Sequence, residues 1–194
     1  MYDLNRSGLE NFLASDPVSP AISQAIIDYL KDDGLLHGHD TVAVQVGGTL
    51  DPTAQVYVVD NPTASISVDA NLKVIIDDAG GQLNVIGKND VLIATGSSDV
   101  KVDLTGSSGN DVVVLGSGNN TVLGGTGADS VYGGTGNDTL QAGGGDHQLL
   151  QGGKGNDQLI GGHGDFDTRT VSTQRRCSER TERRASKISI CSRS

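Results

Sequence analysis

The sequence is poor in large side chains. Of its 194 residues, 3% are aromatic, none is tryptophan and one is methionine, whereas 28 are glycine. Large apolar side chains fill most of the interior of an ordinary globular domain, so this composition excludes a conventional core of bulky residues. Smaller side chains and other interactions must hold the fold together.

Most of the chain also lacks cysteine, and the sequence shows neither a long apolar run nor a recognisable signal peptide. Both cysteines, Cys177 and Cys191, lie near the C-terminus, so the preceding residues cannot form a disulfide. No run approaches the roughly 18 apolar residues of a membrane span. The start, MYDLNRSGLENFL, lacks the basic and apolar regions of a cleaved secretory signal. We therefore expect no membrane span, and export would need another route.

Positive charge is scarce outside the C-terminal tail. The net charge is −10, but the last 26 residues carry +6 and the remainder carries −16. Such an acidic body repels nucleic acid and anionic lipid and attracts multivalent cations. We expect no nucleic-acid partner for the body. The basic tail, residues 170–194, is either an arm that binds acidic surfaces or out-of-frame sequence of doubtful origin, and we favour the second interpretation and a disordered tail.

Residues 1–40 are expected to form a loose polar arm followed by one helix. Ser19 can cap the helix, Pro20 suits its first turn and Gly34 can end it. Its apolar face comprises Ile22, Ala25, Ile26, Tyr29 and Leu30. We expect this helix to cap the open end of a stack of repeats, and an oligomerisation helix is the alternative.

Residues 41–105 contain short β-branched runs separated by turn residues, including TVAVQV, AQVYVVD and LKVIIDD. The later runs recur about every nine or ten residues. We interpret them as degenerate coils of a β-solenoid, with a separate small β-sandwich as the alternative.

Residues 106–169 contain an explicit repeat. It is written as GSSGNDVVV, LGSGNNTVL, GGTGADSVY, GGTGNDTLQ, AGGGDHQLLQ, GGKGNDQLI and GGHGDFDTR. This pattern, G-G-x-G-x-D-x-U-x with U a large aliphatic residue, is an established signature of a calcium-binding parallel β-helix. Position 8 is predicted to point inward, and it holds Val113, Val122, Val131, Leu140, Leu149 and Leu159.

The turns of these repeats have the residue types that calcium requires. Glycines permit tight turns and a close approach of carbonyl oxygens, and position 6 supplies a carboxylate. The candidate ligand residues are Gly109, Asp111, Gly118, Asn120, Gly125, Gly127, Asp129, Gly134, Gly136, Asp138, Gly153, Gly155 and Asp157. Two nonapeptides form one coil, so turns on one edge are 18 residues apart in sequence and roughly 4.8 Å apart in space. We therefore pair Asp111 with Asp129, Asn120 with Asp138, and Asp138 with Asp157.

Stacked acidic turns predict that folding depends on the metal. Carboxylates at strand spacing repel one another, and each coil buries only small aliphatic side chains against roughly 1–2 kcal/mol per residue of backbone ordering. A cation that binds only the folded state shifts the equilibrium toward folding. Two departures weaken the pattern: Asn120 replaces an aspartate, and the fifth repeat is out of phase, with Asp146 at position 5, His147 at the carboxylate position and Gln151 extra. We expect a bulged or vacant site there.

The repeat block resembles that of RTX (repeats-in-toxin) proteins. The resemblance implies Ca²⁺ as cofactor, type I export without N-terminal cleavage, and folding outside the cell. The predicted fold is all-β, a right-handed parallel β-roll or β-helix solenoid with a short N-terminal capping helix. An RTX export signal would lie at the extreme C-terminus, and SKISICSRS does not resemble one.

No catalytic motif accompanies the repeats. The sequence has no G-x-x-x-x-G-K-[ST], H-E-x-x-H or G-x-S-x-G motif. We therefore predict a non-enzymatic extracellular calcium-binding module. The alternative is a calcium-stiffened adhesin or surface-layer module that self-associates in calcium.

Overall fold

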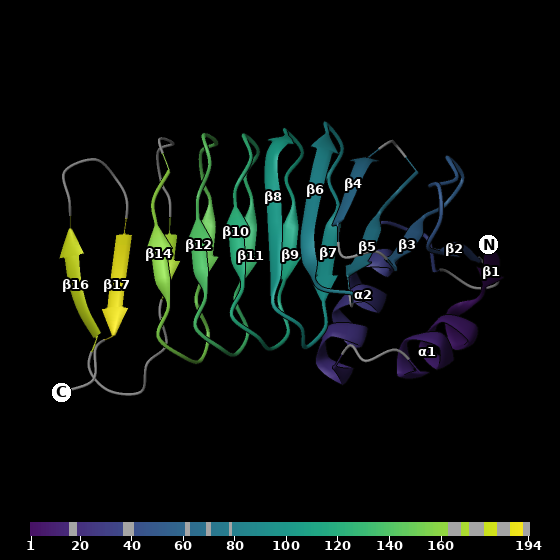
Figure 1. Cartoon of the computed structure of the whole chain (residues 1–194), viewed down its shortest axis with the longest axis horizontal. Coiled ribbons are helices and arrows are strands. Elements are labelled where there is room, and N and C mark those ends of the chain that lie inside the picture. The colour runs from purple at the N-terminus through teal and green to yellow at the C-terminus, as the bar shows by residue number, and fades with distance from the viewer. Residues whose placement is uncertain are drawn as a thin grey trace.

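The chain forms an elongated β-solenoid in the computed structural model (Figure 1). The structure describes residues 1–15, 19–36, 41–60, 63–68, 71–77 and 79–162, and the strand backbones at 168–170, 177–181 and 187–191. The tail is thus described only at those strands, and its predicted origin and disorder stay predictions.

Two sheets face each other across the solenoid. The long sheet has the order β1-β2-β3-β5-β7-β9-β11-β13-β15-β17-β16, and the short sheet has the order β14-β12-β10-β8-β6-β4. From β2 to β15 the pairing within both sheets is parallel, and β1 and β16 add antiparallel strands at the ends of the long sheet. From β3 to β15 the strands of the two sheets alternate along the chain, so each coil there contributes one strand to each sheet. The predicted parallel β-solenoid is confirmed.

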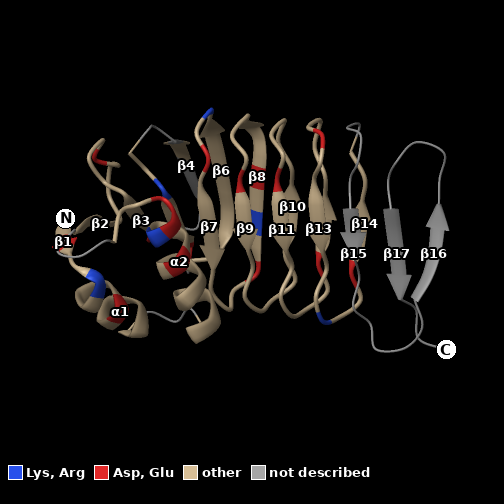
Figure 2. Cartoon of the chain, turned by 180° about the vertical axis from the view of Figure 1, so that it is seen from behind, with Lys and Arg blue, Asp and Glu red and all other residues tan. Residues whose placement is uncertain are grey.

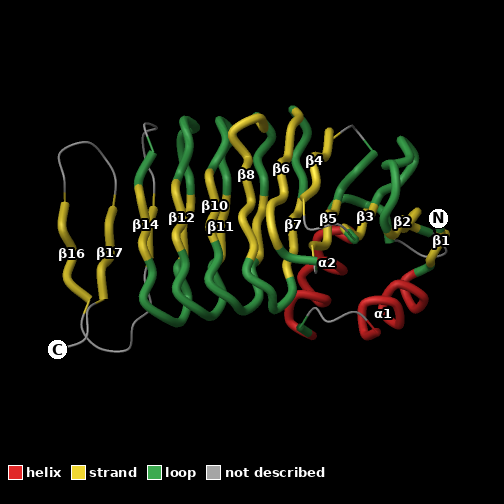
Figure 3. Tube along the Cα trace, in the orientation of Figure 1, coloured by secondary structure: helices red, strands yellow, loops and turns green. Residues whose placement is uncertain are grey.

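The strands of the repeat block are shorter than those that precede them (Figure 3). The first strands are β1 (Tyr2–Leu4), β2 (Val42–Val46), β3 (Val56–Val59), β4 (Thr63–Val68), β5 (Val74–Asp77), β6 (Gly81–Gly87), β7 (Leu92–Thr95) and β8 (Val100–Ser107). Three-residue strands follow: β9 (Val112–Val114), β10 (Thr121–Leu123), β11 (Ser130–Tyr132), β12 (Thr139–Gln141), β13 (Leu149–Gln151), β14 (Gln158–Ile160) and β15 (Thr168–Thr170). The last two are β16 (Cys177–Thr181) and β17 (Lys187–Cys191). The turns of the repeat block therefore contain most of its residues.

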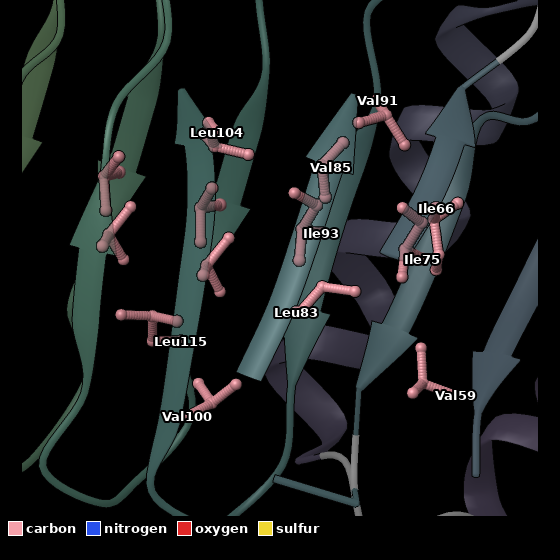
Figure 4. Packing of buried hydrophobic residues seen from close by; sticks show 14 of the residues in the cluster. Val59, Ile66, Ile75, Leu83, Val85, Val91, Ile93, Val100, Leu104 and Leu115 are labelled. Atoms are coloured by element: carbon pink, nitrogen blue, oxygen red, sulfur yellow. The ribbon is translucent and has the colours of Figure 1, made fainter. Parts of the chain in front are cut away.

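Aliphatic side chains fill the interior between the sheets (Figure 4). One cluster of buried residues extends from Tyr57 in β3 to Leu150 in β13. Within the repeat block it contains a single inward residue per strand, as in the parallel pairs Val113–Val131 and Val122–Leu140, together with Leu115 and Ala142 from the turns. The interior is therefore thin, and packing at the turns must contribute to the stability of each coil.

Helix α2 (Pro20–Asp32) forms as predicted, with the Ser19 hydroxyl accepting a hydrogen bond from the Ile22 N–H at 3.4 Å. Its buried residues pack with those of helix α1 (Arg6–Ser15) on the outer face of β2, β3, β5 and β7. These helices cover the side of the long sheet, whereas we expected one helix at the end of the stack. The strands beneath are buried on both faces, which explains their continuous apolar sequences.

Two further expectations require correction. Residues 6–15, interpreted as part of a loose arm, form α1, because Leu9 and Leu13 are fully buried against the second helix and the sheet. In the fifth repeat the inward residue is Leu150, which pairs with Val131, while Leu149 is only half-buried.

None of the described helices has the length and apolar character needed to cross a membrane.

Candidate functional site

The turns of the repeat block form two rows along opposite edges of the solenoid. Edge 1 contains the turns 106–111, 124–129 and 142–148, and edge 2 contains 115–120, 133–138 and 152–157. Acidic residues recur in the turns on both edges (Figure 2). This alternation follows from the repeat, since each nonapeptide supplies one turn and one strand.

The position-6 side chains connect successive turns of the same edge. On edge 1, the Asp129 carboxylate accepts a hydrogen bond from the Asp111 N–H at 3.1 Å. On edge 2, Asp138 accepts from the Asn120 N–H at 2.9 Å, and Asp157 accepts from the Asp138 N–H at 3.0 Å. The structure therefore brings together the three pairs that the sequence predicted to be neighbours.

These carboxylates are buried, and several are only half satisfied. Asp111, Asp129 and Asp138 are at most 1% exposed. One oxygen, Oδ2, has no hydrogen-bond partner and is inaccessible in each of Asp111, Asp138 and Asp157. An unsatisfied buried carboxylate oxygen is costly. A cation beside these oxygens would remove that cost, so the residues present fit a hard divalent ion.

Glycines allow the backbones of successive turns on one edge to approach closely. A Cβ added to Gly127 would collide with the Gly109 carbonyl, and one added to Gly136 would collide with the Gly118 carbonyl. Gly136 also has a φ of +130°, in the region that L-residues avoid. Only glycine allows successive turns to stack this closely.

A Ca²⁺ site between these turns would need main-chain oxygens as well as side chains. Among the residues with described side chains, no three His, Cys, Asp or Glu converge as a metal-binding group. Each gap between turns brings together two position-6 side chains, whereas Ca²⁺ takes about six to eight oxygens. The remaining ligands would be turn carbonyls, and the assignment of individual ligand residues remains a prediction.

The phase of the fifth repeat differs from the prediction. Gln148, not His147, occupies the buried position 6, being 1% exposed. The extra residue lies in the turn, where His147 adopts a φ of 61° and is exposed. The other histidines, His37, His39 and His163, lie outside the described residues.

Sequence reasoning missed Ser107. It occupies position 2 of the first repeat, where the pattern has glycine, and its hydroxyl is buried without a hydrogen-bond partner. The equivalent residue of the next turn on this edge is Gly125, whose N–H donates to Asp129 at 3.0 Å. The available signal was the serine at a position where the repeat has glycine. Its hydroxyl adds an oxygen beside the Asp111 carboxylate.

Burial makes ionisation of these carboxylates unfavourable in the absence of metal. It raises the pKa of Asp111 from 3.8 to about 7, and the charge of Asp129 adds to the rise. Burial also raises the pKa of Asp129 and of Asp138. At neutral pH the metal-free turns therefore contain carboxylates that resist their charged form.

Acid should partly replace the cation. The pKa of Asp111 in the fold lies above its value in an unfolded chain. Protonated Asp111 therefore contributes fully to the stability of the metal-free fold below about pH 3.8, and this stability is lost as the pH rises through about 7. Protein freed of calcium on a chelating resin is expected to show more strand signal by circular dichroism at pH 5 than at pH 8. Asp111→Asn should reduce this difference, and equal order at both pH values would contradict the prediction.

Comparison with known protein families matches this block to the RTX calcium-binding nonapeptide repeat, in four copies over residues 105–140, 123–146 and 142–165. No curated protein and no solved structure matches the chain. RTX nonapeptide repeats bind Ca²⁺, and their turns have the glycine and aspartate positions described above. Residues 105–165 are therefore RTX calcium-binding nonapeptide repeats.

Proposed function

We propose that Ca²⁺ binds between successive turns on both edges and that this binding drives folding of the repeat block. The observation that carries the proposal is the set of buried, unpartnered Oδ2 atoms of Asp111, Asp138 and Asp157. The other oxygen of each carboxylate, Oδ1, accepts a hydrogen bond from an N–H of the preceding coil, so each carboxylate lies where two coils meet. A divalent ion there would bind carboxylates of both coils and neutralise their repulsion.

The proposed ligands are the position-6 side chains Asp111, Asn120, Asp129, Asp138 and Asp157, with carbonyls of the neighbouring glycines. Asn120 would be a weaker ligand, because its amide is neutral and its Nδ2 already donates to the Gly118 carbonyl at 3.3 Å. Ser107 supplies an additional oxygen at the first turn. Ca²⁺ would contribute charge neutralisation and a cross-link between coils.

Folding coupled to calcium suits a protein that functions outside the cell. The cytosol is poor in free Ca²⁺, so the acidic repeat block would stay unfolded there and fold where calcium is abundant. We propose that the chain is exported in this way and acts as a non-enzymatic module. Type I export is the route that the family resemblance suggests.

A calcium titration tests the proposal. In metal-free buffer at pH 7.5 the chain should have a weak strand signal by circular dichroism, and Ca²⁺ should raise it cooperatively. Mg²⁺ at the same concentration should have little effect, because it demands near-ideal octahedral geometry and dehydrates reluctantly. A chelated sample as ordered as the calcium-loaded one would refute the proposal.

Light scattering of the same samples separates the two kinds of extracellular module. A self-contained binding module stays monomeric as calcium rises. A surface-layer or adhesive module self-associates, because Ca²⁺ can also bridge the acidic edges of two molecules.

A further inference from the structure

Gln148 occupies a place in the edge-1 row that an aspartate would fill in a regular repeat. It is 1% exposed, and the strand that follows it, β13, pairs with β11 in parallel. The preceding position-6 residue on this edge is Asp129. Gln148 therefore belongs to the turn 142–148 and faces the turn 124–129, across which a cation would bind in a regular repeat.

The amide of Gln148 connects the two turns. Its Oε1 accepts a hydrogen bond from the Gly143 N–H in its own turn at 2.9 Å, and its Nε2 donates to the Gly127 carbonyl of the preceding turn at 3.1 Å. The orientation of the amide is fixed, because the N–H can only donate and the carbonyl can only accept. The positive end of the amide therefore faces the carbonyl of the neighbouring coil.

The corresponding contact of Asp129 shows what Gln148 replaces. Asp129 accepts from the Gly125 N–H of its own turn at 3.0 Å, as Gln148 does from Gly143. A carboxylate cannot donate to a carbonyl oxygen, so an aspartate at position 148 would need a cation to bridge it to Gly127. The Gln148 amide supplies that bridge as a neutral donor.

The other neutral residue in the rows differs from Gln148 in reach. The Asn120 amide donates to the Gly118 carbonyl of its own turn. Glutamine is one methylene longer, and Gln148 reaches the preceding turn. Of these two amides, Gln148 is the one whose N–H₂ group connects successive coils.

We propose that Gln148 is a metal-independent cross-link that takes the place of calcium between the turns 124–129 and 142–148. The inference rests on the proposed function, since it makes Asp129 the last position-6 residue of edge 1 that binds calcium. The adjoining coils would then be held together on this edge without metal, while edge 2 keeps the calcium-dependent gap between Asp138 and Asp157.

Gln148→Glu tests the proposal with a side chain of the same length. The glutamate cannot donate to the Gly127 carbonyl and adds a carboxylate in the gap. We expect the variant to bind one more Ca²⁺ per chain by isothermal titration calorimetry. At a calcium concentration just above the wild-type folding midpoint the variant should melt several degrees lower than the wild type, and millimolar calcium should abolish most of this difference.

Gln151→Glu is the matched control, because Gln151 lies in the same coil, is exposed and undergoes the same change of charge. It should leave calcium stoichiometry unchanged. Gln148→Met removes the donor without adding charge, so it should lower the melting temperature equally at limiting and at millimolar calcium.

Two outcomes would overturn the inference. One is that Gln148→Glu binds no additional calcium. The other is that it loses the same stability at all calcium concentrations, as a purely structural residue would. A wild-type chain that binds no calcium would instead refute the proposed function, so the two failures are distinguishable.

Discussion

Gly136→Ala is expected to destabilise the calcium-loaded repeat block by about 2–6 kcal/mol. The backbone at Gly136 has a φ of +130°, and holding a residue with a side chain there costs about 1–3 kcal/mol. The added Cβ would also collide with the Gly118 carbonyl, and relieving such overpacking costs typically about 1–3 kcal/mol more. Thermal unfolding in saturating calcium, followed by circular dichroism, measures the loss.

Gly144→Ala is the control for this substitution. Gly144 is exposed, and a Cβ there would meet only the Thr126 methyl group at 3.8 Å, which is an ordinary contact. It should change the melting temperature by far less than Gly136→Ala. Equal effects of the two substitutions would show that close stacking of the turns does not limit stability.

The repeat period was sufficient to predict which turns stack. Residues 18 apart share an edge once each nonapeptide is assigned one turn and one strand, and this placed Asp111 beside Asp129 and Asn120 beside Asp138. The inward residues Val113, Val122, Val131 and Leu140 follow from the same period. A strict period fixes both features because a solenoid repeats its local structure.

The period could not show how the fifth repeat accommodates its extra residue. Leu149 and Leu150 are both leucine, so the sequence is compatible with either as the inward residue. The structure places the extra residue in the turn, where His147 adopts a φ of 61°. This shift moves Gln148 into the buried row, and its two hydrogen bonds favour that choice.

The position of the helices also depended on information that local patterns do not contain. The amphipathic face of α2 was predicted, but its partner was not. That partner is the outer face of β3, β5 and β7, where Val56, Val74 and Leu92 are buried beneath the helices. Runs of apolar residues in these strands were the signal, because a solenoid strand with one solvent-exposed face should alternate.

Substitutions of Asp138 should distinguish the role of its carboxylate as a calcium ligand from its role in the metal-free fold. It accepts from the Asn120 N–H through one oxygen, while the other is buried and unpartnered. Asp138→Asn keeps the acceptor and removes a buried charge that lies beside Asp157. We expect it to stabilise the metal-free form and to raise the calcium midpoint for folding about tenfold or more, which corresponds to at least about 1.4 kcal/mol.

Asp138→Ala should be less stable than Asp138→Asn both with and without calcium, because it removes the hydrogen-bond acceptor as well as the proposed ligand. Asp146→Asn, an equal change of charge at an exposed turn residue on edge 1, controls for the general effect of net charge and should shift the midpoint little. A more stable metal-free form together with a raised calcium midpoint in Asp138→Asn would indicate that the Asp138 carboxylate binds calcium. If the asparagine variant folds at the wild-type calcium concentration, the Asp138 carboxylate is a structural acceptor and calcium binds elsewhere.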